Sequence, residues 1–136
     1  MNTLELTINK LEHGWAELSL LIDDNEMILR FENVPFDTLS ILLESTLKLS
    51  YNMDSTVTFY NFSQKESLTI SRVNSDWSHI EIKNCFFHLP NRALYKAVLR
   101  MFDKYVFAFS VKEYEENWGG FPKKELEVLR SKYHAG

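Results

Sequence analysis

The sequence predicts an α+β fold: a single antiparallel β-sheet of about six strands, packed on one face by a long C-terminal helix and shorter helices. Apolar and polar residues alternate in residues 4–32 and 56–82, as in strands with one exposed face. Apolar residues recur in steps of three and four in residues 37–51 and 90–118, as in amphipathic helices. The links between successive strands are too short for parallel neighbours, so the sheet is expected to be antiparallel.

The first half of the chain is expected to form a meander of three strands in residues 4–32, followed by a helix. Asp37 suits the N-cap of that helix, because its carboxylate can accept hydrogen bonds from free N–H groups of the first turn. Phe36, just before the cap, is then placed to contact Ile41. This arrangement would fix the angle at which the chain enters the helix.

The second half is expected to add three more strands, the last running from about residue 79 toward Phe87. One long helix is expected from Pro90 to Trp118, because proline suits a first helical turn and the following glycine pair can end a helix. A short amphipathic helix is expected from Pro122. The predicted order is three strands, a helix, three strands and two helices, within a single domain of residues 1–136.

Charge is distributed unevenly along the chain. The formal net charge is −4; residues 1–66 contain eleven Asp and Glu against four Lys and Arg, whereas residues 67–136 contain eight against eleven. An acidic first half disfavours a nucleic-acid partner and favours a basic one. The alternative interpretation is ordinary solvation of exposed strand faces. Because the start of the chain lacks a secretory signal and no apolar stretch has the length of a membrane span, we expect a cytoplasmic protein that binds no membrane.

The sequence contains no constellation typical of an enzyme. Cys85 and His88 have a spacing reminiscent of a metal-binding pair, but no second pair completes a site of three or four ligands. The aromatic residues beside Cys85 favour a buried, unreactive thiol. No glycine-rich phosphate-binding loop is present. We therefore expect neither catalysis, nor a metal, nor a cofactor.

Three local features carry a resemblance to a known group of proteins. Gly14-Trp15 opens the second predicted strand, Phe36-Asp37-Thr38-Leu39 opens the first helix, and Tyr114-x-x-x-Trp118-Gly119-Gly120-Phe121-Pro122 links the last two helices. This arrangement resembles small bacterial immunity proteins of polymorphic-toxin and contact-dependent growth inhibition systems. The resemblance spans most of the chain, and its motifs are structural in type.

The resemblance implies a function in protein binding. An immunity protein of this kind binds a cognate toxin domain, often a nuclease, and protects the producing cell. Because a nuclease must attract polyanions, carboxylates on its inhibitor would provide complementary charge. We therefore expect a monomer that binds its toxin one-to-one through Glu12 in the first turn and Asp23, Asp24 and Glu26 around the second.

Two other functions remain open on the sequence. A long apolar helix lying on a curved antiparallel sheet can enclose an apolar ligand, as in helix-grip proteins, and four aromatic residues could line such a pocket. They are Tyr60, Phe102, Phe107 and Phe109. A homodimeric adaptor domain would instead show a large symmetric interface.

Overall fold

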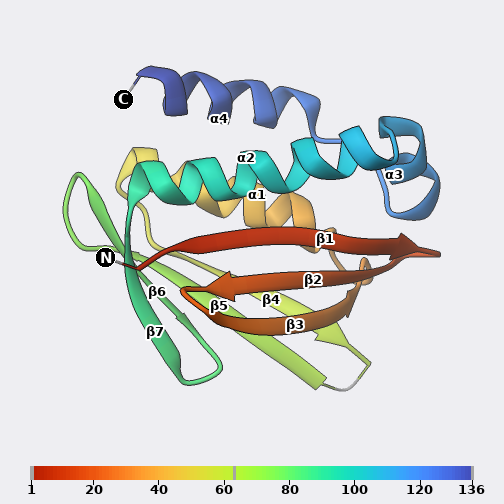
Figure 1. Cartoon of the computed structure of the whole chain (residues 1–136), viewed down its shortest axis with the longest axis horizontal. Helices are drawn as coiled ribbons and strands as arrows, with labels where there is room; N and C mark the ends of the chain where they lie inside the picture. Colours follow the sequence, from red (N-terminus) through yellow and green to blue (C-terminus); the bar gives the residue numbers. More distant parts are fainter. Residues whose placement is uncertain (1, 63, 136) are drawn as a thin grey trace.

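The computed structural model describes residues 2–62 and 64–135 and arranges them in three layers (Figure 1). The strands lie on one side, helices α1 and α2 lie across them, and α4 packs on α2 farther from the strands. The strands are β1 (Leu4–Glu12), β2 (Trp15–Ile22), β3 (Asn25–Glu32), β4 (Ser55–Asn61), β5 (Gln64–Arg72), β6 (Trp77–Ile82) and β7 (Cys85–Pro90). The helices are α1 (Thr38–Lys48), the short 3₁₀ helix η1 (Leu49–Tyr51), α2 (Asn91–Ala108), α3 (Val111–Asn117) and α4 (Lys123–Ala135).

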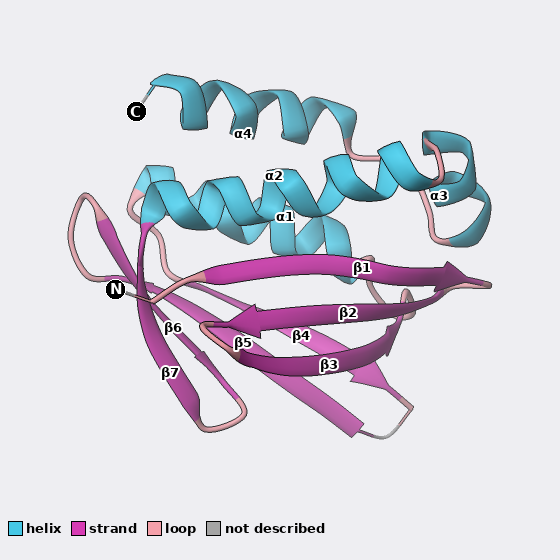
Figure 2. Cartoon of the chain, viewed as in Figure 1, coloured by secondary structure: helices cyan, strands magenta, loops and turns pink. Residues whose placement is uncertain are grey.

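The strands form two antiparallel sheets, so the prediction of a single six-stranded sheet is wrong. One sheet has the order β1-β2-β3 and the other β4-β5-β6-β7, and the helices cover one side of both (Figure 2). Strands β3 and β4 come close without forming a ladder. Their buried side chains meet instead: the rings of Phe31 and Phe59 pack edge to face with centroids 4.8 Å apart. Side-chain packing therefore joins the sheets where backbone hydrogen bonds were expected.

The seventh strand arises because the last predicted strand is interrupted. Lys83 and Asn84 both have positive φ, at 49° and 61°, as in the two-residue turns that connect tight hairpins. The chain therefore reverses after Ile82, and the segment expected to run on toward Phe87 becomes β7, paired antiparallel with β6.

The long helix is also interrupted, so the prediction of one helix from Pro90 to Trp118 is wrong. Helix α2 ends at Ala108, and Ser110 accepts a hydrogen bond at its Oγ from the Glu113 N–H, 3.0 Å away, as the N-cap of α3. Ser110-x-x-Glu113 has the spacing of a capping box, which starts a new helix here. Apolar side chains at this break stay exposed to solvent, and Phe107 is 94% exposed.

The space between the sheets and the helices is filled. Leucine, isoleucine and phenylalanine side chains from both sheets, α1 and α2 leave a cavity of only about 10 Å³ there. Asp37 caps α1 as predicted, since its Oδ1 accepts from the Ser40 N–H at 3.1 Å. No helix in residues 2–62 and 64–135 combines the length and apolar character needed to cross a membrane.

Candidate functional site

Four exposed or half-buried aromatic residues lie where β2 begins, between β3 and α1, and at the end of β4. The rings of Trp15 and Phe62 lie 5.2 Å apart, and those of Phe36 and Tyr60 lie 6.1 Å apart. Phe62 is 81% exposed and Phe36 is 52% exposed. Apolar surface patches mark interaction sites, and Trp and Tyr are enriched among the residues that contribute most to protein binding. We call these four residues the aromatic patch.

Carboxylates flank Trp15 on the strands to either side. In the three-stranded sheet, Trp15 is paired with Glu12 of β1 and Glu32 of β3. Residues directly opposite each other in a sheet point to the same face, with Cβ atoms about 5 Å apart. The indole of Trp15 therefore lies in a row between two carboxylates.

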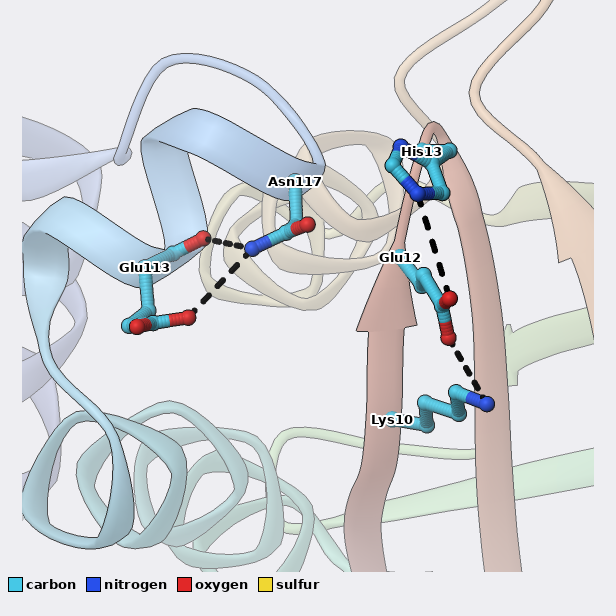
Figure 3. A network of polar contacts seen from close by, with 5 residues as sticks. All are labelled: Lys10, Glu12, His13, Glu113 and Asn117. Atoms are coloured by element: carbon cyan, nitrogen blue, oxygen red, sulfur yellow. Dashed lines mark hydrogen bonds and ion pairs between the residues drawn. The ribbon is translucent and has the colours of Figure 1, made fainter.

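A hollow of about 350 Å³ adjoins Trp15, and its charges are internally paired. Glu12 lies 2.7 Å from Lys10 Nζ and 3.9 Å from His13 Nε2 (Figure 3), and Glu17 lies 2.9 Å from the Arg30 guanidinium. The hydrogen bond from Lys10 lowers the pKa of Glu12. Exposed pairs of this type are worth at most about 1 kcal/mol, so a charged partner can displace them. This hollow therefore combines the apolar ring of Trp15 with ion pairs that a charged partner can replace.

The four carboxylates expected to bind a partner do not form one site. Glu12 lies beside the aromatic patch, whereas Asp23, Asp24 and Glu26 lie at the opposite end of β2, which at about 3.3 Å per residue is about 25 Å away. Their roles also differ. Asp23 accepts hydrogen bonds from Asn2 and from the Thr3 N–H, both at 2.9 Å, and Glu26 accepts from Ser19 at 2.8 Å.

The bonds to Asp23 give it a structural role. The Thr3 N–H, followed by the Asn2 amide, lowers the pKa of Asp23 by favouring its charged form. The carboxylate fastens the start of the chain to the turn between β2 and β3. Asp24 is exposed beside it, so of this group it is the residue best placed to meet another molecule.

The three sequence features behind the resemblance meet at one place in the fold. The Gly14 N–H donates to the Asn117 carbonyl at 2.8 Å, and the Asn33 side chain donates to the Trp118 carbonyl at 2.6 Å. The Trp118 indole N–H in turn donates to Asp37 at 2.7 Å. Figure 3 shows α3, with Asn117, beside the turn between β1 and β2 that carries His13. These residues hold the segments that carry the aromatic patch.

The structure places Cys85 and His88, the two residues considered as a metal-binding pair, on opposite faces of a sheet. Cys85 and His88 occupy positions of opposite parity in β7, so they lie on opposite faces of the sheet and cannot share an ion. Within residues 2–62 and 64–135, no group of three or more His, Cys, Asp or Glu side chains is arranged to hold a metal. The thiol of Cys85 is free and partly buried.

Comparison with protein-family models, with curated proteins and with solved structures gave no match to this chain.

Most of the aromatic patch was not predicted as a binding surface, although two signals for it are present in the sequence. Trp15 falls on the same side of the alternation as Glu17, which is the polar side of its strand. Phe62 lies beside the turn between two strands, where polar residues predominate. Several large aromatic residues at positions expected to be exposed favour a binding surface when the fold brings them together.

Proposed function

We propose that this chain is a protein-binding inhibitor, an immunity protein that neutralises a cognate toxin domain in the cytoplasm of the producing cell. The observation that carries the proposal is the aromatic patch, in which Phe36 and Phe62 are exposed and Trp15 and Tyr60 lie half-buried beside them. Tryptophan and tyrosine dominate the binding energy of protein interfaces because they bury much area at little entropic cost. Glu32 beside Trp15, together with Glu12 once a partner displaces its ion pair with Lys10, favours a basic partner surface.

The filled core weighs against an apolar ligand as the target. A drug-sized molecule needs about 300 Å³ or more, and the space between the sheets and the helices measures about 10 Å³. The four aromatic residues considered as pocket lining also disperse. Phe102 is buried, Phe107 and Phe109 are exposed beside the break between α2 and α3, and Tyr60 belongs to the aromatic patch.

The experiment begins with the polypeptide encoded directly upstream of this chain, produced as a candidate toxin. Co-expression with this chain should restore growth, and titration calorimetry should give the affinity at two salt concentrations. Trp15→Ala and Phe62→Ala should each weaken binding by at least about 30-fold, the effect of losing about 2 kcal/mol at an interface hot spot. Light scattering of the free chain tests the adaptor alternative, because a stable homodimer would contradict the one-to-one inhibitor.

A matched control is available on the other sheet. Phe86 is 66% exposed on β7, so Phe86→Ala removes an exposed aromatic ring without touching the aromatic patch. The affinity of the Phe86→Ala variant for the candidate toxin should equal that of the unmodified chain. If Asp24→Ala weakens binding and Trp15→Ala does not, the interface lies at the far end of β2. If growth is not rescued, the proposed inhibition itself is wrong.

A further inference from the structure

Two histidines face each other on the outer side of the four-stranded sheet. His79 of β6 is paired directly with His88 of β7, and His79 Nδ1 lies 3.2 Å from His88 Nε2. The neighbouring residues Ile80 and Phe87 are buried beneath the helices. Because side chains alternate along a strand, both imidazoles therefore point away from the core. In the free protein one ring N–H donates to the nitrogen of the other ring.

The separation of the two nitrogens also matches a shared metal ion. Zinc binds imidazole nitrogen at about 2.0–2.1 Å. If one ion binds both nitrogens, which are 3.2 Å apart, the N–Zn–N angle is about 100°. That angle falls between the octahedral and tetrahedral values. To bind one ion, both rings turn so that their nitrogens point toward a shared position above the sheet instead of toward each other.

The backbone holds this pair in register. The turn at Lys83 and Asn84 fixes the pairing of β6 with β7, and the His88 N–H donates to the Asn2 side chain at 3.1 Å. Phe86 lies beside the His79 ring, with centroids 6.0 Å apart. The two imidazoles are thus brought together by rigid strands, which keeps the entropic cost of binding an ion low.

We propose that His79 and His88 form an open binding site for one divalent transition-metal ion of the kind that imidazole prefers: Zn²⁺, Ni²⁺ or Cu²⁺. The structure describes no third His, Cys, Asp or Glu ligand at this site. The remaining coordination positions are therefore filled by water or by a side chain of another molecule. A bound ion links β6 to β7, the strand that leads directly into α2. This site is independent of the aromatic patch and of toxin binding.

Protons compete with the metal. Imidazole binds a metal through a neutral nitrogen lone pair, so metal binding by histidine is in general weaker at lower pH. The carboxylate of Glu81, whose residue is paired with Phe86 on the same face, is the nearest acidic group along β6 and favours a cation nearby. This pH dependence distinguishes a histidine site from nonspecific binding to carboxylates.

The test is calorimetric titration of the untagged chain with nickel, copper and zinc salts at pH 7.5 and pH 5.5. We expect one ion per chain at the higher pH and weaker binding at the lower. His79→Ala and His88→Ala should each weaken binding by at least about tenfold, because each removes one of only two protein ligands. His13→Ala and His134→Ala are the controls, since they remove histidines elsewhere on the surface, and binding should be unchanged.

A second measurement locates the ion. Substoichiometric Cu²⁺ should broaden the NMR resonances of residues around His79 and His88 and leave those around His13 sharp. Equal binding by the unmodified chain and the His79→Ala/His88→Ala double variant would overturn the proposal. Broadening centred on Asp23 and Asp24 would overturn it as well. Unfolding curves without metal show whether the variants remain folded, as expected for side chains on the outer face of the sheet.

Discussion

The indole N–H of Trp118 donates a 2.7 Å hydrogen bond to Oδ1 of Asp37, 81 residues earlier in the chain. The same carboxylate caps α1 through the Ser40 N–H and Ser40 Oγ. The Asp37 side chain therefore caps the start of α1 and also binds Trp118, the C-cap residue of α3. This contact stabilises the end of the molecule on which the aromatic patch lies.

Replacement of Asp37 should destabilise the protein more than the loss of an ordinary cap. Asp37→Ala removes the N-cap of α1, worth about 1 kcal/mol, and leaves the buried Trp118 N–H without its acceptor, at a further cost of about 1–3 kcal/mol. Urea unfolding should therefore show a loss of about 2–4 kcal/mol. Ser110→Ala, which removes the cap of α3 alone, should cost about 1 kcal/mol. Equal losses would mean that the bond to Trp118 contributes nothing.

Gly14 should not tolerate a side chain, whereas Gly120 should. Gly14 has φ of +82°, and an added Cβ would lie 2.8 Å from Asn33 Oδ1. Asn33 cannot easily move, because its amide donates to the Trp118 carbonyl at 2.6 Å. We expect Gly14→Ala to lower the free energy of unfolding by more than about 1 kcal/mol. At Gly120, where no atom lies within 4 Å of the added Cβ, alanine should be neutral or stabilising in the same measurement.

Tyr114 should make the protein sensitive to alkaline pH. Burial, followed by the charge of Asp37, raises the pKa of Tyr114 above its usual 10.0. The folded state therefore keeps a proton that the unfolded chain releases above pH 10, and stability should fall as the pH rises beyond that value. Tyr114→Phe should reduce this slope when unfolding is measured between pH 8 and 11. Some slope should remain, because burial also raises the pKa of Tyr95 and Tyr105.

The same substitution should be tolerated at neutral pH. Among the residues that the structure describes, the Tyr114 hydroxyl is buried without a hydrogen-bond partner. Because an unsatisfied buried hydroxyl costs about 1–3 kcal/mol, Tyr114→Phe should raise the free energy of unfolding at pH 7 by about 1 kcal/mol. A clear loss of stability would mean that the hydroxyl has a partner such as a bound water.

Asp23 should control the order of the N-terminal segment. Its carboxylate accepts from the Thr3 N–H at 2.9 Å, so Asp23→Ala should speed hydrogen exchange at the Thr3 amide, and Asp24→Ala should not. The lowered pKa of Asp23 means that this contribution is present above the usual value of 3.8 and is lost as the pH falls through the lower folded-state value. NMR titration of the Thr3 amide should therefore report a midpoint below 3.8. A midpoint at or above 3.8 would contradict the bond.

Local patterns were sufficient to predict most individual elements. The alternation in residues 4–32 is produced by burying one face of each strand, and β1, β2 and β3 follow it. The capping role of Asp37 was predicted because a cap depends on groups within one helical turn. Errors arose where a short local signal was overlooked: the turn at Lys83 and Asn84, and the cap at Ser110.

The candidate site was harder to predict from the sequence, because it depends on contacts between residues that are distant in the chain. The expected partner-binding set combined Glu12 with Asp24, although β2 separates the two residues. The contact of Trp15 with Phe62 and the pairing of His79 with His88 both bring different strands together. No periodicity within one segment predicts such contacts, since they depend on register and on the packing of sheets.

The sequence by itself determined the α+β class, the antiparallel strands and the helical layer, because hydrophobic periodicity and turn residues act over a few positions. Only the tertiary structure decided that the strands divide into two sheets and that the aromatic patch is assembled from three segments. Only the tertiary structure also brought Gly14, Asp37 and Trp118 into one group of hydrogen-bonded segments. The physical reason is that these relationships depend on how preformed elements pack, and that packing is a property of the whole chain.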